Sequence, residues 1–109
     1  MRFDVSIAHE AGWTRVGVIG EPTLGRLLSL LQVLEVDSAA WSHPALLLDL
    51  RGLRTPLARE EQQRLAAEAH RVLWHLKVAV LGASTEPPPR DELRFFADAE
   101  AAREWLKGP

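Results

Sequence analysis

A continuous apolar run that ends abruptly in charged residues constrains this chain most. Residues 45–48 read Ala-Leu-Leu-Leu, and Asp49 and Arg51 follow. A strand that is apolar at every position is typical of a parallel strand with helices packed on both faces. Asp49 and Arg51 are expected where this strand reaches the surface. Thr55 and Pro56 predict an N-cap and the first position of a helix. In open α/β sheets, such a junction is where ligands and partners tend to bind.

The composition sets the class of protein. The chain has 109 residues and no cysteine, which predicts one domain over 1–109 with a single core and no disulfides. The formal net charge of −2 is spread evenly and argues against nucleic-acid binding. The first residues do not resemble a signal peptide, and no apolar run approaches the ~20 residues of a membrane helix. We therefore expect a cytoplasmic protein without a membrane span.

Two strands are expected before the first helix. Phe3, Val5 and Ile7 alternate with polar residues, which predicts a strand with one buried face. After a short turn at 9–12, the alternation resumes over 13–19 with Val16 and Val18 on one face. The two strands are expected to form an antiparallel hairpin.

The first helix is expected to begin at residues 21–23, with Pro22 in its first position. Its leucines recur at the three-four spacing of a buried face, and Leu30 and Val33 add apolar surface beyond it. Two interpretations of this surplus stay open. The connection 36–44, anchored by Trp41, folds over it, or it is a surface for a partner or for a homodimer.

The second half predicts a parallel β-α-β unit. A helix is expected from Pro56 to about His75, followed by a parallel strand over 77–82. Three prolines predict a stiff surface loop over 83–92. A short edge strand over 93–96 and a final helix capped by Asp98 complete the chain. The fold class is α/β, with a mixed sheet of four to five strands and helices packed on it.

Five short segments, in this order and spacing, carry a family resemblance. They are Gly20-Glu21-Pro22-Thr23, Leu46 to Arg51, Lys77 to Gly82, Arg94-Phe95-Phe96 and Trp105-Leu106. The chain resembles, over nearly its whole length, the STAS domain, the fold named for sulfate transporters and anti-sigma-factor antagonists. It is most similar to the small stand-alone bacterial, SpoIIAA-like members. The resemblance implies a regulatory module that binds a protein partner, such as a regulatory kinase or an anti-sigma-like factor.

The resemblance also implies a place for a regulatory phosphorylation. In anti-sigma-factor antagonists, a serine at the start of the helix after the central strand is phosphorylated by a partner kinase. Residues 51–57 contain no serine here, and Thr55 is their only hydroxyl. Its neighbours Arg54 and Pro56 do not reproduce the family's Asp-Ser pair. We interpret Thr55 primarily as a helix cap worth ~1 kcal/mol, with a phosphosite as the alternative.

No pattern of catalytic or metal-binding residues occurs. His70 and His75 are five apart on a predicted helix, which separates them around the axis, whereas a metal pair needs three or four. Glu60 and Glu61 are adjacent and diverge on the same helix. No phosphate-binding glycine loop or hydrolase motif is found. We predict no enzyme activity, no metal and no cofactor.

Two functional hypotheses remain. The first is a regulatory protein-interaction module whose contact surface comprises Arg51, Arg54 and Thr55 at the start of the second helix, with Leu30 and Val33 of the first. The second is a small-ligand module in the cleft at the end of the central strand. There, Arg51 and Arg54 would bind an anionic or lipid-like head, and Leu27, Leu30 or Trp41 would line an apolar wall. Against both stands the interpretation that the arginines only form surface ion pairs with Asp49, Glu60 or Glu61.

Overall fold

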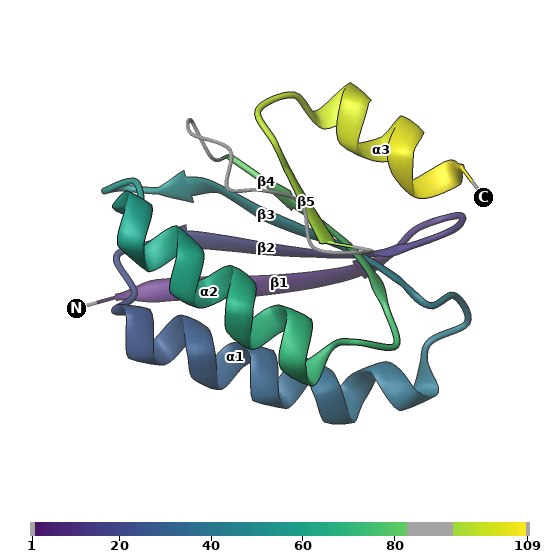
Figure 1. Ribbon diagram of the computed structural model, residues 1–109, viewed down its shortest axis with the longest axis horizontal. Helices are drawn as coiled ribbons and strands as arrows, with labels where there is room; N and C mark the ends of the chain where they lie inside the picture. The colour runs from purple at the N-terminus through teal and green to yellow at the C-terminus, as the bar shows by residue number, and fades with distance from the viewer. Residues whose placement is uncertain (1, 83–92, 109) are drawn as a thin grey trace.

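The apolar run of β3, Ala45–Leu53, lies at the centre of a five-stranded sheet in the computed structural model, which describes residues 2–82 and 93–108 (Figure 1). The strand order is β1-β2-β3-β4-β5. β1 pairs antiparallel with β2, and β2 to β5 are parallel. The predicted hairpin, parallel unit and mixed α/β fold class are confirmed. The other strands are β1 Phe3–His9, β2 Thr14–Gly20, β4 Lys77–Leu81 and β5 Leu93–Phe96.

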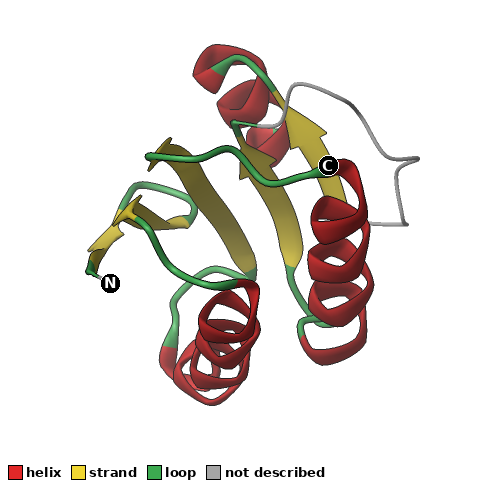
Figure 2. Ribbon diagram, turned by 90° about the vertical axis from the view of Figure 1, so that its left-hand side faces the viewer, coloured by secondary structure: helices red, strands yellow, loops and turns green. Residues whose placement is uncertain are grey.

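Helices cover both faces of the sheet. α1, Leu24–Asp37, and α2, Arg59–Val72, lie side by side on one face, and α3, Ala99–Lys107, lies on the other (Figure 2). The side chains of β3 therefore alternate between two apolar clusters, because successive residues of a strand point to opposite faces. Leu46, Leu48 and Leu50 belong to the α1 and α2 side. Ala45 and Leu47 belong to the α3 side.

Both prolines at the predicted helix starts lie outside the helices. α1 begins at Leu24, with Thr23 as its N-cap, so Pro22 precedes the cap. α2 begins at Arg59, with Ala58 as its N-cap, so the prediction that Thr55 caps this helix is wrong. Two features keep 54–57 out of the helix. Leu53 and Leu57 pack against the core on either side of the turn, and the Glu61 carboxylate accepts the Ala58 N–H at 2.8 Å.

The prediction that β1 buries one face is wrong beyond its first residue. Phe3 is partly buried against the core, but Val5 and Ile7 are 38% and 46% exposed. β1 is an edge of the sheet, and α1 packs mainly beside α2, so none of the described helices covers the outer part of this strand (Figure 2). By contrast, Val16 and Val18 of β2 are fully buried, as predicted.

The surplus apolar surface of α1 is only partly covered. Leu30 and Trp41 are partly buried and pack against the core, whereas Val33 remains 60% exposed. Trp41 follows a short 3-10 helix, Ser38–Ala40, and its indole donates to the Asp37 carboxylate at 2.9 Å. Leu30 therefore packs onto the core, and Val33 remains at the surface.

The C-terminal part agrees with its prediction where the structure describes it. The Asp98 carboxylate accepts the Ala101 N–H at 3.0 Å and caps α3. The loop predicted over 83–92 lies outside the described residues. Among the helices of the described chain, none combines the length and apolarity needed to cross a membrane.

Candidate functional site

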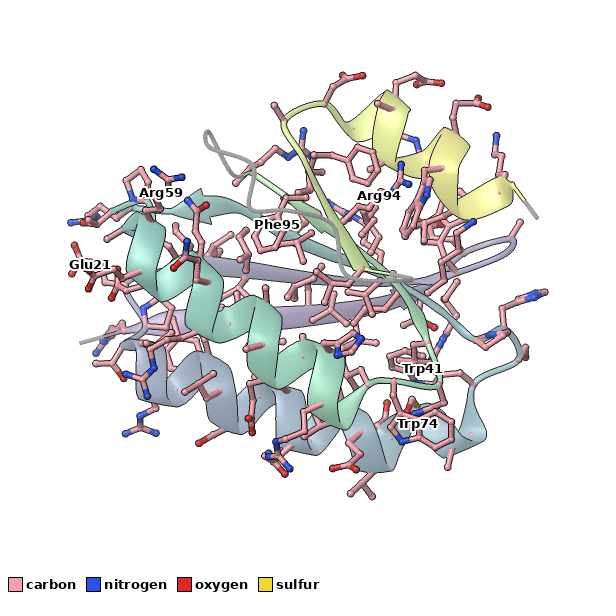
Figure 3. The ribbon with its side chains drawn as sticks, in the orientation of Figure 1. Glu21, Trp41, Arg59, Trp74, Arg94 and Phe95 are labelled. Atoms are coloured by element: carbon pink, nitrogen blue, oxygen red, sulfur yellow. The ribbon has the colours of Figure 1, made fainter. Side chains whose placement is uncertain are left out.

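The carboxyl edge of the parallel strands carries the candidate site. Here the end of β3 turns through 54–58 into α2, next to Gly82 at the end of β4 and Phe95 of β5. Glu21 and Arg59 lie at this end of the molecule's long axis, and Trp41 and Trp74 lie at the opposite end (Figure 3).

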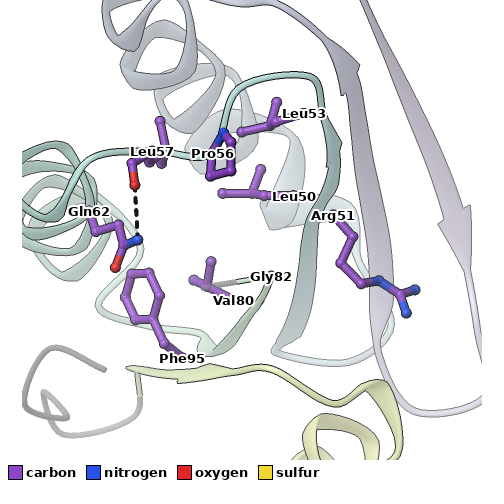
Figure 4. A pocket seen from close by; sticks show the side chains of 9 residues that line it. All are labelled: Leu50, Arg51, Leu53, Pro56, Leu57, Gln62, Val80, Gly82 and Phe95. Carbon is purple, nitrogen blue, oxygen red and sulfur yellow. Dashed lines mark hydrogen bonds between the residues drawn. The ribbon is translucent and has the colours of Figure 1, made fainter. Parts of the chain in front are cut away.

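A cavity of about 70 Å³ lies behind the 54–58 turn (Figure 4). Its wall is mostly apolar and comes from β3, the turn, α2, β4 and β5. Gln62 of α2 and Arg51 are the polar residues among those that line it. The lining residues are Leu50, Arg51, Leu53, Pro56, Leu57, Gln62, Val80, Gly82 and Phe95.

Gln62 supplies an unsatisfied acceptor at this cavity. The residue is 5% exposed, and its side-chain N–H donates to the Leu57 carbonyl at 3.1 Å. Its Oε1 atom is buried and has no hydrogen-bond partner among the described residues. Because an unpaired buried acceptor costs about 1–3 kcal/mol, this oxygen favours a bound donor such as water or a hydroxyl. Sequence reasoning missed Gln62, although it lies three and seven residues before the buried Leu65 and Ala69, on the same helix face.

Arg51 does not point into the cavity. Its guanidinium lies on the other side of β3, directed away from the remaining lining residues (Figure 4). There the Asp49 carboxylate accepts three side-chain hydrogen bonds. The donors are Arg51 Nε at 3.1 Å, Arg51 Nη2 at 2.9 Å and Arg15 Nη2 at 3.2 Å. The predicted arginine-lined anion cleft is therefore wrong for this cavity. Leu27 and Trp41, predicted as its wall, are not among its lining residues.

Asp49 is buried rather than placed where β3 surfaces, and β3 continues to Leu53. Burial alone raises the pKa of Asp49, but hydrogen bonds from Arg51, joined by that from Arg15, outweigh it and hold the pKa below its ordinary value. The same pairing raises the pKa of Arg51. One carboxylate thus organises two half-exposed guanidinium groups on the α3 side of the sheet.

Arg54 and Thr55 form the exposed tip of the turn. Arg54 donates its backbone N–H to the Gly20 carbonyl at 2.8 Å, and its Nε lies 3.4 Å from Glu21 Oε1. These contacts fasten the turn to the end of β2. The Thr55 hydroxyl has no hydrogen-bond partner in the described part of the chain, and the residue is exposed.

The five residues predicted as a surface fall into three places. Arg54 and Thr55 are together on the turn, and Arg51 is on the opposite side of β3. Leu30 and Val33 lie on α1, with only Val33 strongly exposed. Over residues 2–82 and 93–108, no three His, Asp or Glu side chains are grouped in a way that could hold a metal ion.

The fold is the SpoIIAA-like α/β fold of STAS domains, as comparison with solved structures shows. The chain is similar to an anti-sigma factor antagonist from Mycobacterium paratuberculosis, with a TM-score of 0.67 and 17% identity over 98% of this chain and 96% of that one. It is also similar to a variant of RsbS from Moorella thermoacetica in which a serine is replaced by glutamate, with a TM-score of 0.65 and 17% identity over 94% of each chain.

A third similar structure is a protein of the DUF3478 family with a SpoIIAA-like fold, from Shewanella loihica PV-4. The TM-score is 0.50, with 20% identity over 95% of this chain and 93% of that one. No protein-family model and no curated protein matches the sequence. At these identities the likeness establishes the fold, and the predicted resemblance to STAS domains is confirmed at that level.

Proposed function

We propose that residues 1–109 act as one STAS-like regulatory domain that binds a protein partner in the cytoplasm, without enzyme activity of its own. The observation that carries this proposal is the 54–58 turn. It presents Arg54 and Thr55 to solvent while Leu53 and Leu57 anchor it to the core. An exposed tip on a fixed base suits recognition, because little conformational entropy is lost when a partner binds. The likeness to anti-sigma factor antagonists supports the same class of function.

The partner proposed is a regulatory kinase or an anti-sigma-like factor. Arg54 supplies an exposed positive charge, and the Thr55 hydroxyl is accessible and makes no cap. A phosphate on Thr55 would add negative charge beside Arg54 and could switch binding through that contact. Residues 51–57 contain no serine, so Thr55 is the one hydroxyl of that stretch at which such a switch could act.

Affinity capture with three matched baits tests this function. The wild-type chain, Arg54→Glu and Arg103→Glu are each used to capture proteins from the native host, and each captured candidate is then titrated by calorimetry. Arg103 lies on α3, so its substitution changes the charge equally but away from the turn. We expect a kinase or an anti-sigma-like factor that binds the wild type and Arg103→Glu, and binds Arg54→Glu at least about tenfold more weakly. Equal binding to all three baits contradicts the proposal.

The phosphorylation step has its own test. The captured kinase and ATP are incubated with the wild-type chain and with Thr55→Val, and intact masses are measured. Addition of one phosphate to the wild type alone supports Thr55 as the site. Equal phosphorylation of both chains places the switch elsewhere.

A second candidate function is the binding of a small lipid-like ligand, favoured by the unpaired Gln62 Oε1 at the apolar cavity. That oxygen requires a hydrogen-bond donor, so the ligand is an apolar alcohol or amide rather than an anion. Short linear alcohols, from ethanol to pentanol, are the probes, and amide chemical shifts are the measurement. Shifts confined to Leu57, Gln62 and Phe95, and lost in Gln62→Met, support this candidate. Shifts scattered over the chain contradict it.

A further inference from the structure

β1 is an open edge of the sheet. Hydrogen bonds from the Glu10 N–H to the Trp13 carbonyl and from the Glu21 N–H to the Arg2 carbonyl fix which residues of β1 bond to β2. In an antiparallel pair these groups alternate, so the even-numbered residues bond inward. The N–H and C=O groups of Phe3, Val5, Ile7 and His9 therefore point away from β2, and no described strand pairs with them.

This edge carries little of the usual protection. Natural proteins block edge strands with charged side chains, above all lysine, with proline, with a bulge or by keeping the strand very short. Asp4 is the one Asp, Glu, Lys or Arg residue of β1. β1 has seven residues without proline or lysine, and its pairing with β2 is regular throughout. Val5 and Ile7 are also substantially exposed on the side of the sheet where α1 lies. An edge of this length and composition is a template for another strand.

We propose that the strand added is β1 of a second copy of this chain, paired antiparallel about a two-fold axis at Ser6. In this register Arg2 of each copy lies opposite Glu10 of the other, so that two pairs of opposite charge close the ends. Val5 lies opposite Ile7 of the other copy, and the two Ser6 residues face one another. Each contact occurs twice or lies on the axis, as an isologous interface requires.

The charges select this register over its neighbours. The outward N–H and C=O groups belong to odd-numbered residues, so an odd residue of one copy must face an odd residue of the other. This holds only when the two-fold axis passes through a residue, so the alternative registers place the axis at a neighbouring residue of β1. An axis at Ile7 places Asp4 opposite Glu10, and an axis two residues before Ser6 places Asp4 opposite itself. Both arrangements oppose like charges, which destabilises strand pairing. An axis at Val5 leaves Glu10 without a facing residue. Among these four axes, only the axis at Ser6 pairs opposite charges.

Burial of apolar surface favours the same dimer. Val5 and Ile7 point to the side of the sheet that α1 occupies, since they face the buried Val18 and Val16 of β2. In an antiparallel edge pairing, both copies present the same face, so these four side chains form one strip. Val33 is exposed, and it is about 100° around α1 from Gln32, which contacts Glu68 of α2. The proposed interface is centred on β1 and does not use Val33, in contrast to the homodimer through the first helix considered from the sequence.

A charge exchange tests the register. Sedimentation velocity over a concentration series is run on the wild type, Arg2→Glu, Glu10→Arg and an equimolar mixture of the two variants. Each variant opposes like charges twice when it self-associates, so we expect its dimer dissociation constant to rise about tenfold. The mixture restores both opposite-charge pairs and is expected to regain wild-type association. Glu104→Arg on α3 is the matched control and should dimerise as the wild type does.

A cross-link at the axis gives a second, independent measurement. The chain has no cysteine, so Ser6→Cys introduces one thiol. In a pair without hydrogen bonds the facing Cα atoms are about 4.5 Å apart, within the range of a disulfide. Ser6→Cys is expected to form a disulfide dimer on mild oxidation. Ala8 is also exposed and lies on the same face of β1. Ala8→Cys lies too far from the same residue of the other copy and should not form a disulfide.

Three results would overturn the proposal. They are a wild type that stays monomeric at millimolar concentration, a mixture that associates no better than the single variants, and equal cross-linking of the two cysteine variants. Circular dichroism of every variant shows that it is folded before it is scored. The proposal does not depend on the 54–58 turn, so loss of partner binding by Arg54→Glu and loss of dimerisation are separate outcomes.

Discussion

Asp49 accepts three hydrogen bonds from Arg51, which lies two residues further along the same face of β3. The donors are the Arg51 backbone N at 3.0 Å, Nε at 3.1 Å and Nη2 at 2.9 Å. The Asp49 carboxylate is buried and also accepts a hydrogen bond from Arg15 Nη2. This arrangement fixes Arg51 on the α3 side of the sheet. Arg51 is therefore part of a structural ion-pair cluster and does not join Arg54 on the turn.

Asp49→Asn is expected to destabilise the protein by about 1–3 kcal/mol at neutral pH, because one buried acceptor of charged donors is replaced by a neutral amide. Urea unfolding followed by circular dichroism measures the change. Asp4→Asn, an exposed aspartate on β1, is the matched control and should change the free energy of unfolding by less than about 0.5 kcal/mol. Equal losses in the two variants would show that the Asp49 cluster adds nothing to stability.

The pKa of Asp49 predicts how stability depends on pH. Its pKa is lower in the folded protein than the ~3.9 of an unfolded chain, so the unfolded state binds the proton more readily. The stability contributed by Asp49 is therefore full above about pH 4–5 and is lost as the pH falls through the folded pKa. Urea unfolding of wild type and Asp49→Asn between neutral pH and about pH 3 should show the gap between them narrowing with acid. A gap that stays constant or widens contradicts the assignment.

The fold could be predicted because its signals are periodic. The alternation over 14–18, the leucine spacing of α1 and the apolar run of β3 each depend on which faces are buried, and burial follows hydrophobicity. The exception is β1, where Val5 and Ile7 carry the pattern of a buried face at an edge that no helix reaches. Alternation of apolar and polar residues shows which face of a strand can be buried, whereas the packing of helices on the sheet decides whether that face is buried.

The candidate site could be predicted only in part, since its geometry depends on side-chain pairing between distant segments. Arg51 and Arg54 are three residues apart, yet Arg51 pairs with Asp49 on β3, whereas Arg54 lies on the turn and pairs with Glu21. The unsatisfied acceptor of Gln62 becomes apparent only once Leu57 takes its other amide group. The one signal in the sequence for this site was a polar residue, Gln62, on the buried face of α2.

A pair of threonine substitutions tests the position of the helix caps. Thr23 Oγ1 accepts the Arg26 N–H at 3.2 Å and caps α1, whereas Thr55 lies three residues before the N-cap of α2. Thr23→Ala is expected to cost about 1 kcal/mol of stability. Thr55→Ala should cost less than about 0.5 kcal/mol, because the residue is exposed and makes no cap. Thermal or urea unfolding distinguishes them, and a larger loss at Thr55 would restore the cap predicted from the sequence.

Two glycines with positive φ test how the 54–58 turn is held in place. Gly20 has φ of +106°, and a Cβ there would lie 2.5 Å from the Arg2 carbonyl oxygen and 2.8 Å from Phe3 Cα. Gly12 has φ of +140°, but apart from Gly12 and its two chain neighbours, no described atom lies within 4 Å of an added Cβ. Gly12→Ala should therefore cost only the backbone strain of about 1–2 kcal/mol, and Gly20→Ala clearly more.

The Gly20→Ala substitution should also affect the 54–58 turn, because the Gly20 carbonyl accepts the Arg54 N–H that fastens the turn. Displacing β1 from Gly20 shifts this carbonyl and loosens the turn. Hydrogen exchange of the Arg54 amide is expected to accelerate in Gly20→Ala and to stay at the wild-type rate in Gly12→Ala. If both variants leave that amide equally protected, the turn is held by Leu53 and Leu57 alone, and its position is independent of the end of β2.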